Sequence, residues 1–349
     1  MDDRYSRQIL FAPIGAGGQQ RLAAARVTIV GCGALGTAQA DLLARAGVGR
    51  LHLVDRDFVE ASNLQRQTLF DEEDARAALP KAVAARARLG RVNSAIRIEA
   101  LVADLIPANA EELLAGSDVV LDGTDNFETR YLLNDWAVAR GVPWVYGAAV
   151  ASRGMSFTVI PGETACLNCL FPEYGREGAA VHETCDTVGV LAWTVSQVAA
   201  VQVAEAVKLL VGARSSLRRS LWSADLWRNE FRELAAPARD PQCRACGHRE
   251  FVHLEGEGRA AVTLCGRNAV QIHEHRRQLE LAALAVRLRP HGEVRANDFA
   301  LRFLPLAALG ASDAPGKIEM MIFPDGRALI KGVADAGLAR SLYARYVGA

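Results

Sequence analysis

The sequence predicts an α/β protein: a doubly wound, Rossmann-like and mostly parallel sheet with an antiparallel extension and a structural zinc site, followed by a small C-terminal α+β domain. Three observations predict it. Strands and helices alternate across residues 26–150, a glycine-rich turn follows the first strand, and two Cys-x-x-C pairs come later. The chain has 349 residues, of which 50% are hydrophobic and 23% charged, and its net charge is zero. That composition is typical of a globular protein and does not favour nucleic acid or a membrane as the main partner.

The first part of the chain is a series of buried strands joined by helical segments. The expected strands are residues 26–31, 50–55, 96–105, 118–126 and 143–149, which are apolar and rich in β-branched residues or alternate in polarity. The expected helices are residues 34–46, 73–90, 110–116 and 127–140. Parallel strands connected by helices require right-handed crossovers, so this order predicts the doubly wound sheet.

A different pattern begins at residue 151. We expect an antiparallel strand at 154–162, a buried helix at 188–212 and two strands within 216–234. Polar residues interrupt the 188–212 segment, so we do not interpret it as a membrane span. We predict a first domain at 1–250, which contains the cysteine pairs, and a second domain at 255–349. In the latter the expected elements are β (261–272), α (277–287), β (293–304), a hairpin across 323–326 and α (335–347).

The turn after the first strand has the pattern G-x-G-x-x-G at Gly31, Gly33 and Gly36. Between a strand and a helix, this pattern places a phosphate at the helix N-terminus, where N–H groups and the helix dipole favour anions. Asp55 ends the second expected strand, where an acid accepts hydrogen bonds from ribose hydroxyls. The pattern indicates a nucleotide without saying which one, and a turn used only for close packing is the alternative.

The two Cys-x-x-C pairs are Cys166/Cys169 and Cys243/Cys246. Four thiolates in two such pairs are the usual ligands of a closed tetrahedral Zn²⁺ site, and four protein ligands leave no position for catalysis. The sequence therefore predicts a structural zinc ion; a redox dithiol or incidental cysteines are the alternatives.

The segment DGTDN (122–126) follows a strand of the predicted sheet, where open α/β sheets bind their ligands. A carboxylate of Asp122 or Asp125 at this edge could hold Mg²⁺ on the phosphates of a nucleotide. Equally, Asp125 and Asn126 could simply cap the helix that begins at 127.

Three further features carry chemistry. The run SNLQRQ (62–67) gathers amide and hydroxyl groups around Arg66, and Lys81 begins a helical segment. Both cations suit a triphosphate, although a solvated surface lysine is the natural alternative for Lys81. Cys185 precedes the 188–212 helix, where a thiolate is favoured, and a small buried side chain is its alternative.

Taken together, these blocks resemble the HesA/MoeB/ThiF adenylyltransferases, bacterial relatives of the ubiquitin-activating enzymes. The blocks that carry the resemblance are RYSRQI (4–9), GCGALG (31–36), LVDRDFVEASNLQRQ (53–67), PK (80–81), DGTDN, CLNC (166–169) and CRAC (243–246). The resemblance covers residues 1–250. It implies ATP-dependent adenylation of the C-terminal glycine of a small ubiquitin-like sulfur-carrier protein, with release of pyrophosphate, as a step in sulfur transfer to a cofactor or metabolite.

The resemblance also assigns roles. It implies that Asp55 holds the ribose, that Asp125 binds Mg²⁺, and that Arg7 reaches into the site of a second subunit, so that the active form is a homodimer. The residues that it places around ATP are Gly31, Gly33, Ala34, Gly36, Asp55, Asn63, Gln65, Arg66, Lys81, Asp125 and Asn126. For Gln65 and Gln67 the alternative is that they serve only to hold the backbone of their own loop. Cys185 matches a loop cysteine that some members link covalently to the carrier and others do not need.

The sequence departs from the family pattern in two places. Ala34 stands where many relatives have glycine, which is tolerated if only its N–H is used. Residues 255–349 have no counterpart in the minimal enzymes and no rhodanese-like cysteine loop. We expect this domain to dock the carrier or another partner. A sulfurtransferase that donates the sulfur is a further expected partner of the protein.

Adenylation also fits the residues themselves. An ionised carboxylate attacks an anionic phosphate, so cations and N–H donors are needed and a general base is not.

A nicotinamide-dependent oxidoreductase would share the glycine turn and Asp55 but has no use for two cations on a triphosphate. The neutral net charge and the cysteine pairs disfavour a third possibility, a carboxylate-activating enzyme of tRNA modification with the same fold. A binding protein that has lost catalysis is disfavoured because the polar residues are intact. No signal peptide is visible, so we expect a cytoplasmic protein.

Overall fold

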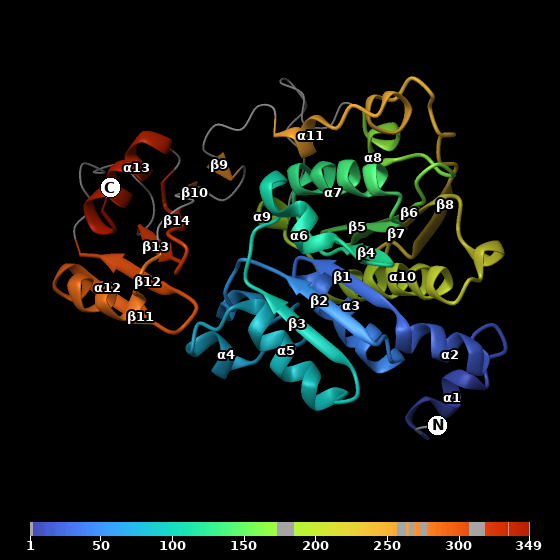
Figure 1. The fold of residues 1–349 in the computed structure, drawn as a ribbon, viewed down its shortest axis with the longest axis horizontal. Helices are drawn as coiled ribbons and strands as arrows, with labels where there is room; N and C mark the ends of the chain where they lie inside the picture. Colours follow the sequence, from blue (N-terminus) through green and yellow to red (C-terminus); the bar gives the residue numbers. More distant parts are fainter. Residues whose placement is uncertain are drawn as a thin grey trace. The chain divides into compact units, whose positions relative to one another are not determined.

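A computed structural model of the chain describes residues 3–172, 185–256, 263–264, 269–272, 278–306, 318–333 and 335–348. The chain divides into two units, Met1–Glu257 and Gly258–Ala349 (Figure 1). Each unit has a sheet and a hydrophobic core of its own.

The sheet of the first unit has eight strands in the order β3-β2-β1-β4-β5-β6-β7-β8. The neighbouring strands from β3 to β5 are parallel, and those from β5 to β8 are antiparallel. The strands are β1 (Arg26–Val30), β2 (Arg50–Val54), β3 (Arg97–Leu101), β4 (Val119–Asp122), β5 (Trp144–Val150), β6 (Arg153–Val159), β7 (Leu221–Asp225) and β8 (Glu230–Leu234). The predicted mostly parallel sheet with an antiparallel extension is confirmed.

Helices cover both faces of this sheet. They are α1 (Ser6–Ile9), α2 (Gly15–Ala24), α3 (Ala34–Ala46), α4 (Glu72–Arg76), α5 (Lys81–Val92), α6 (Ala110–Leu114), α7 (Phe127–Arg140), α8 (Leu167–Leu170), α9 (Cys185–Val188), α10 (Ala192–Leu210) and α11 (Val252–Glu255). Figure 1 shows α6 and α7 on one side of the parallel strands and α3, α5 and α10 on the other. Val27 and Ile29 of β1 pack into the core under α3, α5 and α10, whereas Val30 packs under α6 and α7. This alternation follows from the two-residue period of a strand.

Two expectations need correction in their boundaries. The single helix expected at 73–90 is two helices, α4 and α5. Between them the backbone passes through Ala78 with φ 48°, and Pro80, which has no N–H to continue a helix, precedes α5. The helix expected at 188–212 is the shorter α10, which buries eight of its side chains. Among the described residues, no helix is long and apolar enough to cross a membrane.

The second unit is a six-stranded sheet in the order β11-β12-β13-β14-β10-β9, antiparallel at every described pairing. Its strands are β9 (Thr263–Leu264), β10 (Ala269–Ile272), β11 (Gly292–Ala296), β12 (Leu301–Pro305), β13 (Glu319–Ile322) and β14 (Ala328–Lys331). Two helices, α12 (Leu281–Leu288) and α13 (Ala336–Tyr346), share its core. The predicted α+β character and the hairpin across 323–326 are confirmed. The strand expected at 293–304 is a hairpin, because the Asn297 side chain accepts hydrogen bonds from the N–H groups of Phe299 and Ala300 and turns the chain.

Candidate functional site

The glycine turn joins β1 to α3. Two of its three glycines are closely packed, and the third is not. A β-carbon on Gly31 would lie 2.6 Å from the carbonyl oxygen of Gly123, and one on Gly36 would lie 1.8 Å from the carbonyl oxygen of Gly31. These two glycines are therefore needed for close packing. Gly33 differs, because the nearest atoms to a β-carbon there are 3.9 Å away. The space above Gly33, at the N-terminus of a 13-residue helix, is where the backbone can approach a phosphate.

Asp55, which follows β2, is bonded to this turn. Its Oδ2 accepts a hydrogen bond from the Cys32 N–H at 2.6 Å, and its Oδ1 accepts one from the Asp57 N–H at 2.6 Å. Burial raises the pKa of Asp55 to about 6, although the nearby Lys81 ammonium and these N–H donors act in the opposite direction. The carboxylate is thus held rigidly beside the turn and is ionised above that pH.

Lys81 reaches the same corner from another direction. It is the first residue of α5, its N–H donates to the Asp57 carbonyl at 2.9 Å, and its Nζ lies 3.1 Å from Asp57 Oδ2. Only 9% of its side chain is exposed, so Lys81 is not a solvated surface lysine. The sequence reasoning missed Asp57, although a second acid two residues after Asp55 was a signal that could have identified it.

The 61–70 loop brings one amide group, that of Gln67, to the glycine turn. Asn63 is buried, and its Oδ1 accepts from the Glu60 N–H at 3.2 Å. Arg66 is half-buried and donates from Nη1 to the Ser62 carbonyl at 2.9 Å. Gln65 is exposed, whereas Gln67 is buried with its Nε2 3.9 Å from the position of a β-carbon on Gly33. Of the two glutamines, Gln67 is therefore the one beside the turn.

The segment after β4 separates the two aspartates of DGTDN. Asp122 is fully buried, and its carboxylate accepts from Arg130 Nε at 2.9 Å and from the N–H and hydroxyl of Thr124 at 2.9 and 2.6 Å. Because its carboxylate is used in this buried ion pair, Asp122 has a structural role. The sequence did not predict the pair, since nothing distinguishes Arg130 from other residues of a helical segment. Asp125 is exposed at the end of the segment. Gly123, earlier in the same segment, lies against Gly31 of the glycine turn.

Of the two residues that could cap α7, Asn126 is the one that does so. It is the N-cap of α7, and its Oδ1 accepts from the Thr129 N–H at 2.8 Å. The cap is therefore Asn126 and not Asp125.

Arg7 lies at the opposite edge of the sheet. The Tyr5 hydroxyl accepts from Asn93, the C-cap residue of α5, and Gln8 donates to the carbonyl of Ala46 at the end of α3. Since α5 begins at Lys81 and has 12 residues, the two ends of this helix are ~18 Å apart. The structure thus does not bring Arg7, which is exposed, to the glycine turn of its own chain.

The four paired cysteines come together as the sequence predicts. Their sulfur atoms all lie within 4.8 Å of one another, with Cys166 3.8 Å from Cys169, Cys166 3.6 Å from Cys243 and Cys169 3.5 Å from Cys246. A tetrahedron of sulfurs around Zn²⁺, with Zn–S bonds of ~2.3 Å, has edges of ~3.8 Å. The geometry therefore fits a zinc ion. The Cys166/Cys169 pair is held in place by the N–H of Leu167, which donates to the buried Asn134 side chain at 2.9 Å.

Cys185 begins α9, and its side chain lies outside the described residues. The described cysteines include Cys32, which is buried in the glycine turn as a packing residue.

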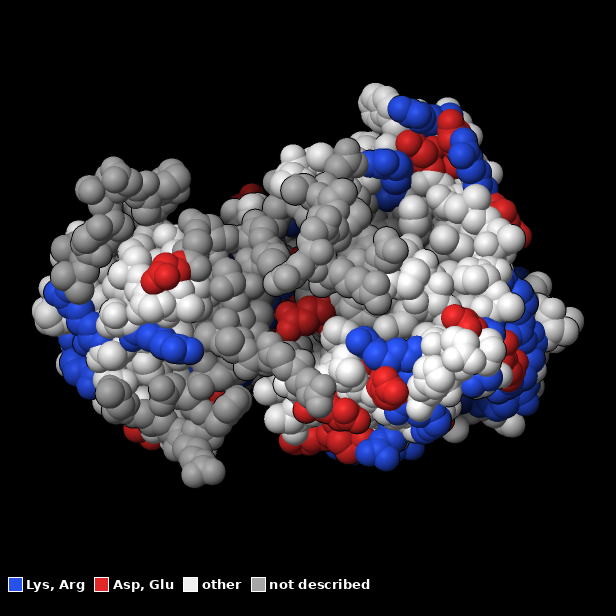
Figure 2. Space-filling model, turned by 90° about the horizontal axis from the view of Figure 1, so that it is seen from above, with Lys and Arg blue, Asp and Glu red and all other residues white. Residues whose placement is uncertain are grey.

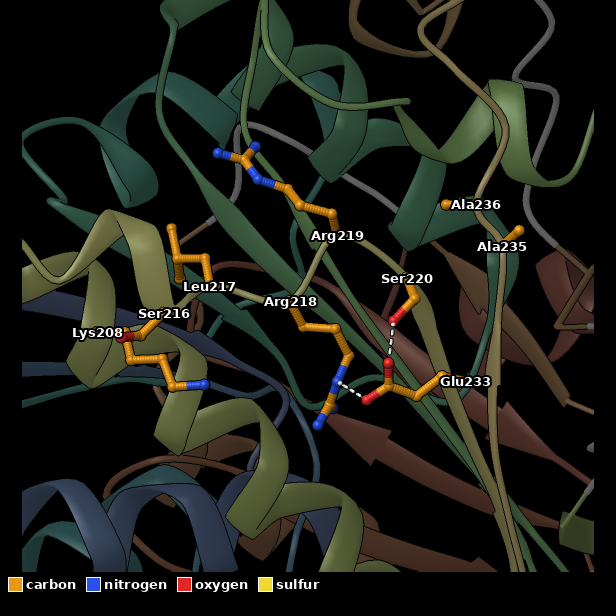
Figure 3. Close-up of a pocket in the computed structure, with 9 residues that line it drawn as sticks. All are labelled: Lys208, Ser216, Leu217, Arg218, Arg219, Ser220, Glu233, Ala235 and Ala236. Carbon is orange, nitrogen blue, oxygen red and sulfur yellow. Dashed lines mark hydrogen bonds and ion pairs between the residues drawn. The ribbon is translucent and has the colours of Figure 1, made fainter.

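A surface pocket of about 620 Å³ lies elsewhere, between the end of α10 and the strands β7 and β8 (Figure 3). Its cations are paired with acids: Lys208 with Glu205 at 2.5 Å and Arg218 with Glu233 at 3.3 Å. On the face seen in Figure 2, basic and acidic side chains are likewise interspersed. The candidate site is instead the corner around Gly33, Asp55 and Lys81, where open space above a helix N-terminus meets a buried acid and a buried cation.

Comparison with known proteins identifies the family of the chain. The model of the ThiF family matches residues 5–245. The chain is 46% identical over 352 residues to a sulfur carrier protein ThiS adenylyltransferase of Bacillus subtilis, with all of both chains covered. It is 40% identical over 245 residues to the molybdopterin-synthase adenylyltransferase of Escherichia coli, covering 70% of this chain and 96% of that one.

The fold also matches a solved structure. The crystal structure of E. coli MccB with ATP superimposes with a TM-score of 0.61 at 23% identity, covering 71% of this chain and 75% of that one. At this identity the likeness shows the fold alone. The resemblance seen in the sequence motifs is confirmed by the family match and by the full-length relative: the chain belongs to the ThiF family.

Proposed function

We propose that this protein adenylates the C-terminal glycine carboxylate of a small ubiquitin-like (β-grasp) sulfur-carrier protein. A carboxylate oxygen of the carrier attacks the α-phosphorus of ATP. A new P–O bond forms while the bond from the α-phosphorus to its bridging oxygen breaks, and pyrophosphate leaves with that electron pair. The product is a carrier acyl-adenylate, ready for sulfur transfer to a cofactor or metabolite. The named activities of the B. subtilis and E. coli relatives support this proposal.

Each residue of the corner has a part in this reaction. The N–H groups of Gly33 and Ala34 face the phosphates at the N-terminus of α3, and Asp55 accepts hydrogen bonds from the ribose. Asn63, Arg66 and Lys81 supply donors and positive charge for the developing negative charge on the phosphates. The carrier carboxylate is already ionised at neutral pH, so no residue has to remove a proton from it.

Asp125 is the residue that would hold Mg²⁺. Its carboxylate is exposed at the strand edge, and Mg²⁺ typically takes one or two carboxylates together with phosphates and water. When bound, the ion would neutralise charge on the phosphates. Asn126 orders the segment that carries Asp125 through its cap, and Gln65 stays a candidate contact from the exposed side of its loop.

The observation that carries the proposal is the buried position of Lys81. A cation at the first residue of a helix opposes the helix dipole, and burying it costs further free energy. Its place beside Asp57 and the glycine turn is explained by a polyanionic ligand. A nicotinamide cofactor has no third phosphate and would explain the buried position of Lys81 less well than ATP.

The test is a pyrophosphate assay with the full chain, ATP, Mg²⁺ and a β-grasp carrier ending in Gly-Gly. We expect pyrophosphate release and an acyl-adenylate of the carrier, detected by mass spectrometry, and neither product with a carrier that lacks the final glycine. Arg66→Ala should lower the rate by ~10²–10³, the usual effect of losing one transition-state charge contact. ATP binding without carrier-dependent pyrophosphate release would reject the proposal.

We propose that the active form is a homodimer in which Arg7 of one subunit enters the site of the other. The position of Arg7 at the far edge of its own sheet supports this arrangement. In the same way, Cys185 is proposed as the thiol that links to the carrier: its sulfur attacks the carbonyl carbon of the acyl-adenylate, a thioester forms, and AMP leaves with the electron pair of the broken C–O bond. A thiol-sensitive carrier adduct that is trapped with the full chain and lost in Cys185→Ala would support that role.

The second unit, which corresponds to the expected domain at 255–349, is proposed to dock the carrier or a sulfurtransferase that donates the sulfur. The chain can be shortened after Glu257, where the first unit ends. If the shortened chain still melts cooperatively but binds the carrier and the sulfurtransferase as tightly as the full chain does, the docking role is wrong.

A further inference from the structure

The side chain of Gln67 is buried beside the glycine turn with an unsatisfied polar atom. It is 4% exposed, and its Nε2 lies 3.9 Å from the position of a β-carbon on Gly33. Within the described part of the chain, its Oε1 is buried and has no hydrogen-bond partner. Buried amides normally have partners, because leaving one unmade costs free energy comparable to a lost hydrogen bond.

The loop itself does not need this amide. The carbonyl of Asn63 accepts both the Arg66 and the Gln67 N–H groups at 3.0 Å, and the Asn63 side chain accepts the Glu60 N–H. These bonds already define the backbone from Glu60 to Gln67. The Oε1 of Gln67 therefore has no bond to make within its loop, while Nε2 lies beside the glycine whose surroundings are open.

We infer that Gln67 is a further nucleotide-contacting residue, whose amide is satisfied only when ATP is bound. The inference rests on the proposed function. An amide has one donating and one accepting end, and ATP above Gly33 offers the complement of each, since phosphate oxygens accept hydrogen bonds and ribose hydroxyls donate them. Gln67 thus adds a neutral contact between the phosphates near Gly33 and the ribose near Asp55.

The experiment measures the Kd of ATP by isothermal titration calorimetry for the full chain, Gln67→Met and Gln67→Glu. Methionine has a similar shape without the hydrogen bonds, and glutamate places a negative charge near the phosphates. We expect Kd to rise roughly 10- to 100-fold for Gln67→Met and further for Gln67→Glu, because hydrogen bonds to charged groups are the strong ones. The matched control is Gln20→Met on α2, an exposed glutamine, which should leave Kd unchanged.

A second measurement distinguishes binding from packing. Without ATP, the Tm of Gln67→Met should not fall below that of the unaltered chain, because the substitution removes an unsatisfied buried group. An unchanged Kd, or a lowered Tm with an unchanged Kd, would overturn the inference while leaving ATP-dependent adenylation standing. If the unaltered chain itself does not bind ATP, the proposed function fails and this inference fails with it. Should Gln67→Met not fold, Gln67→Asn, which keeps an amide but shortens its reach, takes its place with the same expected direction.

Discussion

The ammonium of Lys81 lies 3.1 Å from a carboxylate oxygen of Asp57, in a corner where the two side chains are 9% and 23% exposed. Asp57 in turn donates its N–H to Asp55, which accepts the N–H of Cys32 in the glycine turn. Lys81, which we propose contacts the phosphates, is thus positioned by the same short chain of bonds that holds Asp55, the acid proposed to bind the ribose. The site is preorganised before a nucleotide arrives.

Lys81→Met should lower adenylation by ~10²–10³ without unfolding the first unit, because the charge contact is made most strongly as charge develops on the phosphates. The measurement is carrier-dependent pyrophosphate release, with circular dichroism to verify folding. Arg88→Met, which removes an exposed cation further along α5, is the matched control and should retain the full rate. A folded Lys81→Met variant with an unaltered rate would remove Lys81 from the site.

ATP affinity should fall as the pH drops through about 6. The pKa of Asp55 is raised to about 6, so the carboxylate that accepts ribose hydroxyls is present above that pH and is protonated below it. Because Lys81 lowers this pKa, the fall should move to higher pH in Lys81→Met. The check is the Kd of ATP from pH 5 to 8, and Asp55→Asn should flatten the profile. A flat profile for the unaltered chain would contradict this.

The unliganded chain should show the opposite sign in its stability. A carboxyl whose folded pKa lies above its unfolded value of about 3.9 binds more protons when folded, so ionised Asp55 opposes folding above pH 6, and that penalty disappears as the pH falls to about 4. Asp55→Asn, which removes the ionisation, should therefore stabilise the chain more at pH 8 than at pH 4.

Arg7→Ala and Lys81→Met should each be inactive alone and restore activity when mixed. If Arg7 acts in the other subunit, a mixed dimer has one site with both residues intact. Since random exchange makes half of the dimers mixed, the mixture should reach about a quarter of the unaltered rate. Refolding the two variants together and measuring pyrophosphate release tests this. No recovery, with mixed dimers verified by native mass spectrometry, would count against Arg7 acting between subunits.

Zinc should be bound once per chain and should stabilise the first unit. Cys243→Ser or Cys169→Ser removes one of the four thiolates, so the metal content should fall and the free energy of unfolding should decrease by on the order of several kcal/mol. Elemental analysis and chemical denaturation measure the two effects. Cys32→Ala, which alters a cysteine outside the cluster, should keep the metal. A full zinc content after loss of a paired cysteine would reject the site.

The buried ion pair of Asp122 and Arg130 should be costly to break on one side only. Arg130→Met leaves the fully buried Asp122 carboxylate without its cation, and we expect a loss of about 3–5 kcal/mol in the free energy of unfolding. Arg130→Met combined with Asp122→Asn should recover part of that loss, because no buried charge is left unpaired. Urea denaturation of the two single variants and the double variant measures the coupling, and additive losses would show that the pair does not act as a unit.

Local signals in the sequence were sufficient for the order of strands and helices, the glycine turn and the two cysteine pairs. Each of these depends on neighbours within a few residues: apolar periodicity, a glycine spacing, a Cys-x-x-C repeat. The local signals were not sufficient at Ala78 and Pro80. There the helical periodicity predicts one continuous helix, but the backbone breaks it into α4 and α5.

The sequence alone determined that this chain is a ThiF-family nucleotide fold with a thiol cluster. Only the tertiary structure decided which polar residues share one corner. Asp57 meets Lys81 across 24 residues, Gln67 rather than Gln65 lies beside Gly33, and Asp122 is bound to Arg130 while Asp125 stays exposed. The reason is physical: a side chain's partners and burial depend on how separate strands and helices pack, and spacing along the chain does not specify that packing.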